Sequence, residues 1–439
     1  MLNKYISIFF FLSIICSVWL ATHLVTRESF TLCHSSNNSF RTLFVNSKMN
    51  NAGFNFAVAD GLEFTQYQKI GKYVPITGNL EQMKYFMNAL KNSKNQKVRI
   101  AHFGDSLILG DIITEYLRNK FQVEYGGYGV GMLSIVADDS RMKRTVTQTY
   151  SDDWTYASIV SGDREQYPLG MNGTVCVPKP GSWVQYEASR VFDNVSSFEL
   201  VRVLYSNSDR TSTIEYAFDD DQPKMVSLEN STGLKQLILD AKRKVTKVRI
   251  RFISGKAPYM YSVSLESTGN GVYVDNFSLR GNSGVSLLDI ASDTYEKYDQ
   301  FVNYNLIILN FGANVSFPDR SAYILYENKM EEVINKLKKV FPKTSFLLIG
   351  VGDKTMKRGS RFMTNPDIPF LIDIQKRIAE KTGIAFWNLW EVMGGDNSMY
   401  SWVNAAPPLA FRDYVHLNSE GGEIIANLLF EALNNLRQN

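Results

Sequence analysis

The chain has 439 residues, of which 44% are hydrophobic and 21% charged, a composition typical of folded globular proteins rather than disordered or fibrous ones. At roughly 100–200 residues per domain, this length favours two or three domains. The net charge of +3 and the absence of a long basic run argue against a nucleic-acid partner. The three cysteines, Cys16, Cys33 and Cys176, are too few for a disulfide scaffold and lack a CxxC zinc spacing.

The N-terminal segment, residues 1–26, is predicted to be a signal anchor or signal peptide. Residues 5–25 contain no Asp, Glu, Lys or Arg, and their length suffices to cross a bilayer, which takes roughly 20 residues. Lys4 precedes the apolar run and is expected to stay in the cytoplasm. Because no A-x-A-like cleavage site follows, an uncleaved anchor is favoured over a removed signal peptide. The remainder is therefore expected to be periplasmic or at the cell surface, and to meet a membrane only through this segment.

Residues 27–96 are predicted to be an N-terminal extension without chemistry. It ends in a predicted helix over residues 80–90, where Met83, Phe86 and Leu90 repeat at helical spacing.

An α/β domain is predicted in two parts, residues 97–140 and 271–439. In the first part, an apolar strand at 97–103 is followed by Gly104, Asp105 and Ser106 and then by a helix at 108–121. The second part repeats this pattern. Its expected strands are 272–279, 304–311, 345–349 and 384–389, and its expected helices are 324–340, 368–381 and 420–436. Continuously apolar strands favour a parallel sheet covered by helices on both faces.

Residues 141–270 follow a different pattern and are predicted to form an inserted all-β sandwich. Short stretches of alternating polarity, such as Val248, Ile250 and Phe252 separated by arginines, are divided by turn-like sequences. The glycine-rich segment 126–131 lacks the P-loop pattern and is expected to be a flexible loop near the site.

Ser106 and the pair Asp413 and His416 are the candidate catalytic residues. A serine between a strand end and a helix start meets backbone N–H groups and a helix dipole that favour developing negative charge. An Asp three residues before a His can fix the imidazole tautomer, which leaves Nε2 to accept a serine proton. Taken singly, Ser106 also fits a helix N-cap and His416 a surface histidine. His102, the other histidine outside the N-terminal region, is expected to be a core residue.

Gly281 and Asn314 are the candidate oxyanion donors, together with the backbone N–H of Ser106. Each follows a predicted strand, so each also fits an ordinary glycine turn. In an open parallel sheet the carboxyl ends of the strands form one rim where ligands bind. Because the candidate residues all lie at such strand ends or in neighbouring loops, the sequence favours one shared site. Asp111 is an alternative carboxylate, although a helix start also accounts for it.

In chain order, Gly104-Asp105-Ser106, Gly281, Gly312-x-Asn314 and Asp413-x-x-His416 resemble the four motif blocks of the SGNH, or GDSL, hydrolases. The resemblance covers residues 97–140 and 271–439 and implies a flavodoxin-like parallel sheet of SGNH-hydrolase type. It assigns Ser106 as nucleophile, His416 as general base and then acid, Asp413 as the orienting carboxylate, and Ser106, Gly281 and Asn314 as the oxyanion hole. Val315 departs from the family, which often has an acidic residue after the third-block Asn.

More narrowly, the sequence after Ser106 is similar to exported bacterial SGNH proteins that act on acetylated polysaccharide. Peptidoglycan O-acetylesterases of that group carry an inserted carbohydrate-binding β-domain at the same place. The resemblance therefore implies a serine esterase that removes O-acetyl groups from a glycan, with no metal or organic cofactor. Two alternatives stay open: an O-acetyltransferase using the same acyl-enzyme, and a non-catalytic glycan-binding protein.

The insertion contributes two further open questions. Six aromatic residues are candidates for stacking on sugar rings, although most aromatic residues in a sandwich belong to its core. They are Trp154, Tyr156, Trp183, Tyr186, Tyr259 and Tyr261. In an oxidising compartment Cys33 and Cys176 either pair or remain thiols, and sequence does not decide between these.

Overall fold

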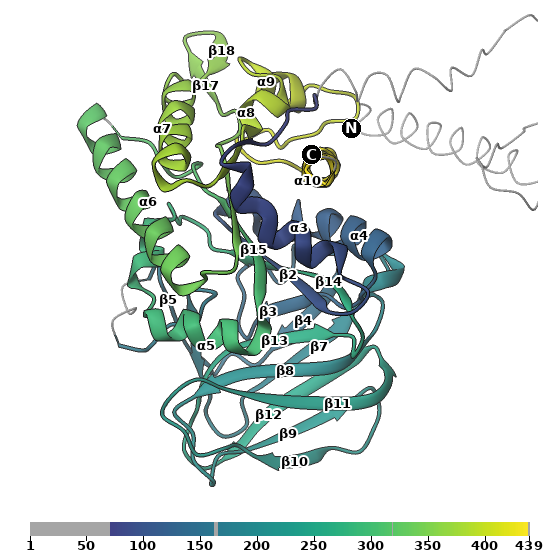
Figure 1. Ribbon diagram of the computed structural model, residues 1–439. Helices are drawn as coiled ribbons and strands as arrows, with labels where there is room; N and C mark the ends of the chain where they lie inside the picture. Colours follow the sequence, from purple (N-terminus) through teal and green to yellow (C-terminus); the bar gives the residue numbers. More distant parts are fainter. Residues whose placement is uncertain (1–70, 162–165, 318, 438–439) are drawn as a thin grey trace, which may run out of the picture. The chain divides into compact units, whose positions relative to one another are not determined.

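The computed structural model describes residues 71–161, 166–317 and 319–437 (Figure 1). These described residues belong to one compact unit. The predicted anchor at residues 5–25, together with Cys16 and Cys33, lies outside the described residues and stays a prediction. Within the described ranges, no helix combines the length and apolar character needed to cross a membrane.

A parallel sheet forms the α/β part of the fold. Its strand order is β1-β19-β16-β15-β2-β14, in which β1 is the antiparallel edge and all other neighbours are parallel. Counted along the chain, the parallel strands take the order 2-1-3-4-5, which is the predicted flavodoxin-like arrangement. The strands are β1 (Thr77–Gly78), β2 (Lys97–Gly104), β14 (Gly271–Ser278), β15 (Tyr304–Asn310), β16 (Ser345–Ile349) and β19 (Ala385–Trp387).

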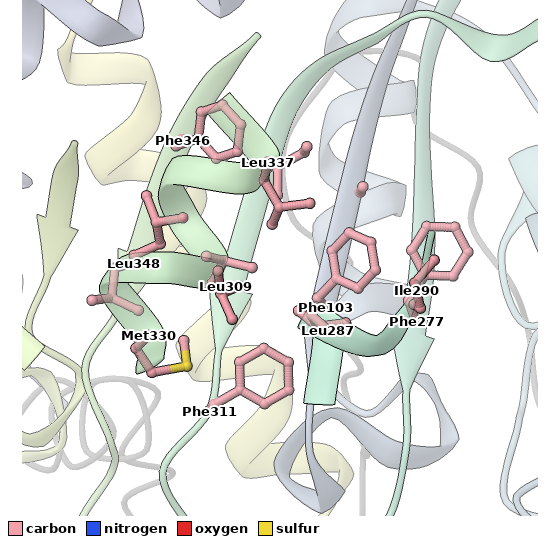
Figure 2. Close-up of a cluster of buried hydrophobic side chains, with 14 of the residues drawn as sticks. Phe103, Phe277, Leu287, Ile290, Leu309, Phe311, Met330, Leu337, Phe346 and Leu348 are labelled. Atoms are coloured by element: carbon pink, nitrogen blue, oxygen red, sulfur yellow. The ribbon is translucent and has the colours of Figure 1, made fainter. Parts of the chain in front are cut away.

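Strand β2 explains why this sequence forms a buried parallel strand. All its residues after Lys97 are buried. The alternation of a strand sends Val98 and Ile100 to one face of the sheet and Ala101 and Phe103 to the other. Figure 2 shows the second face, where the side chains of the sheet pack against helix α6 (Arg320–Val340) and the segment before α5. The labelled side chains are Phe103, Phe277, Leu287, Ile290, Leu309, Phe311, Met330, Leu337, Phe346 and Leu348.

Helices cover both faces of the sheet, as the continuous apolar strands predict. On the face of Val98 the core includes α3 (Lys84–Lys91), α4 (Thr114–Tyr125), α8 (Leu389–Met393), α9 (Ser398–Val403) and α10 (Ser419–Asn435). On the face of Phe103 it includes α5 (Ser292–Val302), α6 and α7 (Asp367–Thr382). A small hairpin of β17 (Thr355–Arg358) and β18 (Arg361–Thr364) lies beside α9 in Figure 1.

Two predicted helices differ in detail. The helix expected at 108–121 is a 3₁₀ helix, η2 (Ser106–Asp111), followed by α4. Gly110 and Asp111 between them adopt φ values of +68° and +71°, which no continuous helix accommodates. The conformation at Asp111 is held by an ion pair with Arg118 at 2.7 Å, so its carboxylate does not cap a helix. The helix expected at 80–90 divides into a 3₁₀ turn, η1 (Leu80–Met83), and α3.

Two antiparallel sheets lie between β2 and β14 in sequence. Their orders are β10-β9-β12-β7-β4 and β11-β8-β13-β6-β5, and β3 also pairs with β13. Side chains such as Ile250 of β12 and Val203 of β8 share one core, so the two sheets pack as a sandwich. The strands are β3 (Gly131–Ser134), β4 (Val146–Tyr150), β5 (Thr155–Ser158), β6 (Thr174–Val177), β7 (Trp183–Ala188), β8 (Phe198–Ser206), β9 (Thr213–Phe218), β10 (Lys224–Ser227), β11 (Lys235–Val245), β12 (Lys247–Ser254) and β13 (Tyr259–Glu266).

The antiparallel pairing begins earlier in the chain than expected, because β3 precedes residue 141. The division into domains at 97–140, 141–270 and 271–439 therefore stays a prediction.

The second half of the glycine-rich segment 126–131 is packed, contrary to the expectation of a flexible loop near the site, whereas Gly126 is exposed. A Cβ at Gly129 would lie 2.4 Å from the carbonyl oxygen of Leu265, and a Cβ at Gly131 equally close to Asp275 Oδ1. Both glycines have positive φ, so they serve close backbone approach. Gly126 accepts a hydrogen bond from the N–H of Val272 at the start of β14, the end of the strand opposite the candidate site.

Candidate active site

Ser106 follows β2, the strand between β14 and β15, and so lies where the strand order reverses. The preceding Asp105 fixes the loop around it. One carboxylate oxygen of Asp105 accepts from the Leu107 N–H at 2.9 Å, and the other accepts from the N–H groups of Gly312 and Ala313 at 3.1 and 3.0 Å. Burial raises the pKa of Asp105 to about 6, although these N–H donors act against it. Asp105 therefore joins the nucleophile loop to the loop after β15.

His416 and Asp413 lie in the loop before α10 and face Ser106. Ser106 Oγ is 2.7 Å from His416 Nε2, and His416 Nδ1 is 2.7 Å from Asp413 Oδ2. The other oxygen of Asp413 accepts from the N–H groups of Val415 and His416, each at 3.0 Å. Tyr414 between them has φ +60°, a conformation uncommon for a bulky residue, which folds the loop back on the carboxylate. The structure thus brings the three predicted catalytic side chains into one hydrogen-bonded row.

The charge of Asp413 determines how the imidazole is oriented. Partial burial of the Asp413 carboxylate acts to raise its pKa. Hydrogen bonds from the backbone and ring of His416 and from Val415 outweigh this effect, so the pKa of Asp413 lies below its usual range. An ionised carboxylate accepts a hydrogen bond from Nδ1–H. This network assigns the tautomer in which Nε2 carries a lone pair directed at the Ser106 hydroxyl.

The three predicted oxyanion donors come from adjacent strand ends. Gly104 is paired with Ser278 of β14 on one side and with Asn310 of β15 on the other. Gly281 lies three residues beyond β14, and Asn314 lies four residues beyond β15. The strand register therefore places the loops of Ser106, Gly281 and Asn314 side by side at one rim.

The hydrogen bonding around these donors leaves capacity for an oxyanion. Among the described residues, the backbone N–H groups of Ser106 and Gly281 have no hydrogen-bond partner. Gly281 has φ +81° and open space where a Cβ would lie. Asn314 Nδ2 donates to the carbonyl of Asn282 at 3.3 Å, and a carboxamide has a second N–H to donate. Val315, which replaces an acidic family residue, is buried in the core of the Phe103 face.

Two features of the site were not predicted from the sequence. One is the bridging role of Asp105, which was visible only as part of a short motif. The other is the environment of Tyr414, whose ring packs on Phe362 of β18 at a centroid distance of 4.8 Å. A three-residue spacing predicts the Asp413–His416 pair but says nothing of a hairpin that is distant in sequence.

His102 is a buried core histidine, as expected. Its Nδ1 lies 3.0 Å from Thr114 Oγ1, and burial lowers its pKa to about 4. It belongs to β2 and takes no place in the row of Ser106.

The residues flagged in the insertion have different environments. Tyr186 and Tyr261 are buried, so they belong to the core rather than to a sugar-binding surface. The Arg249 guanidinium covers the Trp183 ring at 4.3 Å from its centroid. Cys176 is a buried free thiol in the described part of the chain. No group of three His, Cys, Asp or Glu side chains within the described ranges is placed to hold a metal ion.

Comparison with known proteins defines the fold class. No family model matches the chain, and no curated protein matches its sequence. A solved structure described as a peptidoglycan O-acetylesterase in action is similar with a TM-score of 0.68 and 20% sequence identity, over 83% of this chain and 99% of that one. This likeness confirms, at the level of the fold, the resemblance to SGNH esterases.

Other solved structures are similar over parts of the chain. A family two carbohydrate esterase from Cellvibrio japonicus is 10% identical with a TM-score of 0.26, over 67% of this chain and 98% of its own. An acetyl xylan esterase is 19% identical with a TM-score of 0.29, over 37% of this chain and 81% of its own.

Proposed function

We propose that this chain is an exported serine esterase that removes O-acetyl groups from a glycan such as peptidoglycan. The row of Ser106, His416 and Asp413 at the rim of the parallel sheet is the observation that carries the proposal. The fold shared with the peptidoglycan O-acetylesterase structure supports the choice of an acetyl ester on a glycan. Export rests on the apolar segment at residues 5–25, which is also the only expected contact with a membrane.

In the proposed first half-reaction, Ser106 Oγ attacks the acetyl carbonyl carbon while its proton moves to His416 Nε2. Asp413 holds Nδ1–H and stabilises the imidazolium that forms. The negative charge on the carbonyl oxygen is held by the N–H groups of Ser106 and Gly281 and by the Asn314 carboxamide. When the C–O bond to the sugar breaks, the imidazolium returns its proton to the departing sugar oxygen.

In the second half-reaction, water replaces the sugar. His416 removes a proton from the water, which attacks the acetyl-Ser106 carbonyl, and the proton then passes to Ser106 Oγ as acetate leaves. Neither step calls for a metal ion or an organic cofactor.

Substitution of the nucleophile tests the proposal. We expect the full-length Ser106→Ala protein to lose acetate release from O-acetylated peptidoglycan by about 10³-fold or more. Ser227→Ala, an exposed serine on β10, is the matched control and should retain wild-type activity. A fluorophosphonate should label the wild type at Ser106 by mass spectrometry. Wild-type turnover by Ser106→Ala, or labelling elsewhere, would contradict the assignment.

The same acyl-enzyme serves an O-acetyltransferase if a sugar hydroxyl replaces water in the second step. Measuring released acetate against acetyl transfer to a chitooligosaccharide separates these outcomes. A non-catalytic glycan-binding protein predicts instead that the wild type binds the glycan, releases no acetate and resists the fluorophosphonate.

A further inference from the structure

Three aromatic rings form a cluster next to the candidate catalytic loop. Phe362 of β18, Tyr400 of α9 and Tyr414 of the catalytic loop lie with centroids 4.8 to 6.2 Å apart. The planes of Tyr400 and Tyr414 are inclined by only 8°. These three residues are called the aromatic platform below. Because Tyr414 directly follows Asp413, the platform adjoins the Ser106–His416 row.

Two of the three platform rings are exposed to solvent, whereas Tyr414 is half-buried. Phe362 is 36% exposed and Tyr400 40% exposed, and nearby in sequence Phe411 is 50% exposed. Leaving large rings in water forgoes the stabilisation of burial, and exposed apolar groups gathered in one place mark binding surfaces. Several other apolar side chains are exposed in the described part of the chain. Among all these exposed side chains, Phe362 and Tyr400 are the ones that stack with another ring.

Backbone contacts hold the platform in place. The N–H of Thr355, at the start of β17, donates to the carbonyl of Tyr414 at 3.0 Å. The N–H groups of Thr364 and Asn397 each donate to the other residue's side chain, at 3.2 and 2.7 Å, and tie β18 to the start of α9. The three rings therefore come from elements that are fixed to one another and to the catalytic loop (Figure 1).

One exposed cation lies on the same face of the hairpin as the platform. Lys357 is paired across the β17–β18 hairpin with Phe362, and its Nζ lies 5.6 Å from the centroid of the Phe362 ring. Arg358 is paired with Arg361, so the alternation of the strands directs these two side chains to the opposite face. Within the described ranges Lys357 forms no ion pair. An unpaired cation beside stacked rings suits a ligand that carries both an apolar face and an anionic group.

We propose that the platform is a sugar-binding subsite for a carboxylate-bearing glycan, which narrows the substrate class of the proposed esterase and rests on that proposed function. The electron-rich faces of aromatic rings attract the weakly positive C–H groups on a pyranose face. The Lys357 ammonium pairs with a carboxylate on the same or a neighbouring sugar. A sugar bound there lies beside His416, which is where the ester must be presented.

The hairpin tip favours a glycan over an anionic membrane. Gly359 and Ser360 form the tip between Arg358 and Arg361, so no aliphatic side chain projects from it. Interfacial membrane binding depends on apolar side chains that insert below the headgroups, whereas the exposed ring of this hairpin, Phe362, stacks on Tyr414 at a centroid distance of 4.8 Å and does not stand at the tip.

The binding test uses the full chain carrying Ser106→Ala, so that binding is measured without turnover. Adding Phe362→Ala and Tyr400→Ala should weaken its co-sedimentation with O-acetylated peptidoglycan about tenfold. Tyr73→Ala, a ring 41% exposed elsewhere, is the matched control and should not change binding. In otherwise wild-type protein, the double substitution should lower kcat/KM for the polymer about tenfold more than kcat/KM for p-nitrophenyl acetate.

A second arm tests the carboxylate. Lys357→Gln should weaken binding of peptidoglycan about threefold and flatten its dependence on salt, but leave the weaker binding of neutral chitooligosaccharides unchanged. Lys224→Gln, an exposed lysine on β10 of the β-sandwich, is the matched control.

Any of three results would overturn the subsite. The first is unchanged glycan binding after Phe362→Ala and Tyr400→Ala, and the second is an equal loss of binding for the neutral and the acidic glycan in the Lys357→Gln variant. The third is platform-dependent binding to phosphatidylglycerol vesicles without platform-dependent glycan binding. Failure of the proposed function looks different, because the wild type would then release no acetate while the binding measurements remain interpretable.

Discussion

At the scale of single residues, the site depends on two carboxylates. Asp105 directly precedes Ser106 in sequence, and Asp413 lies three residues before His416. Asp105 is buried and accepts three backbone N–H groups, so it fixes the position of Ser106 relative to the loop of Asn314. Asp413 is half-exposed and orients His416. Asp105 is a positioning residue, whereas Asp413 contacts the general base His416 directly.

Asp413→Asn is expected to lower kcat for p-nitrophenyl acetate by about 10³–10⁴-fold, because an amide at this position favours the wrong imidazole tautomer. The exposed Asp220→Asn is the control and should have no effect. Steady-state kinetics at neutral pH measures the change, and circular dichroism checks the fold. Retention of more than a tenth of the activity would remove Asp413 from the proposed mechanism.

Glu115 of α4 gives a pH-dependent prediction for stability. Its side chain is 1% exposed; one oxygen accepts from Arg144 at 3.1 Å and the other has no partner in the described residues. Burial, followed by the charge of Asp111, raises its pKa to about 7. Since this pKa is higher than in the unfolded chain, its contribution to stability is full below about pH 4 and is lost as the pH rises through 7.

Glu115→Gln should therefore be more stable than the wild type at pH 8, by about 1–3 kcal/mol, and the difference should close by pH 5. Calorimetric melting at the two pH values measures it, with the exposed Glu187→Gln as control. A Glu115→Gln protein that melts below the wild type at pH 8 would show that the ionised carboxylate stabilises the fold.

At the scale of elements, a buried ion cluster joins the parallel sheet to the β-sandwich. Glu266 at the end of β13 is fully buried and pairs with Arg99 at 2.5 Å, Lys97 at 2.9 Å and Arg202 at 3.2 Å. Arg99 also reaches Asp275 of β14 at 3.3 Å. Burial pushes the pKa of Glu266 upward, but the three cations outweigh it and hold the pKa far below its usual range. Strands β2, β8, β13 and β14 thus meet at one charge cluster.

Glu266→Gln should destabilise the protein by about 3–5 kcal/mol, because it leaves the buried Arg99 guanidinium without its main counter-charge. Denaturant unfolding measures the loss. Glu229→Gln removes an exposed partner of Lys235 and should give no measurable change. Equal stability of the two variants would mean that water or another group compensates Arg99.

At the scale of the whole molecule, the described residues form one compact unit even though their sheets differ in type. Strand β3 lies in the first part of the predicted α/β domain and pairs with β13 of the predicted insertion. Unfolding of the sandwich alone would break both this pairing and the Glu266 cluster, so it has a high free-energy cost.

Thermal unfolding of the chain should consequently give one calorimetric transition that covers both the parallel sheet and the sandwich, with equal calorimetric and van't Hoff enthalpies. Near-ultraviolet circular dichroism and intrinsic fluorescence should give the same midpoint. Two resolved transitions would show that the sandwich unfolds as a separate domain.

The sequence alone determined the parallel strands, because a strand buried on both faces must be continuously apolar, as residues 98–103 are. Sequence patterns likewise predicted α3, α4, α6, α7 and α10 in outline, whereas α5, α8 and α9 were not predicted. The sequence also determined the pairing of Asp413 with His416, since their spacing is local. Local spacing did not reveal the break in the helix at Gly110 and Asp111, which depends on a buried ion pair with Arg118.

Only the tertiary structure decided which distant segments meet. Ser106 and His416 are 310 residues apart, and their side chains are 2.7 Å apart. This contact arises because α10, which follows the loop of His416, packs against α4, which follows the loop of Ser106. The aromatic platform and the Glu266 cluster likewise combine residues from separate elements. Such contacts depend on how the strands are ordered and how the layers pack. The pattern of polar and apolar residues along the chain shows which face of a helix or strand is buried. It does not show which other helix or strand packs against that face.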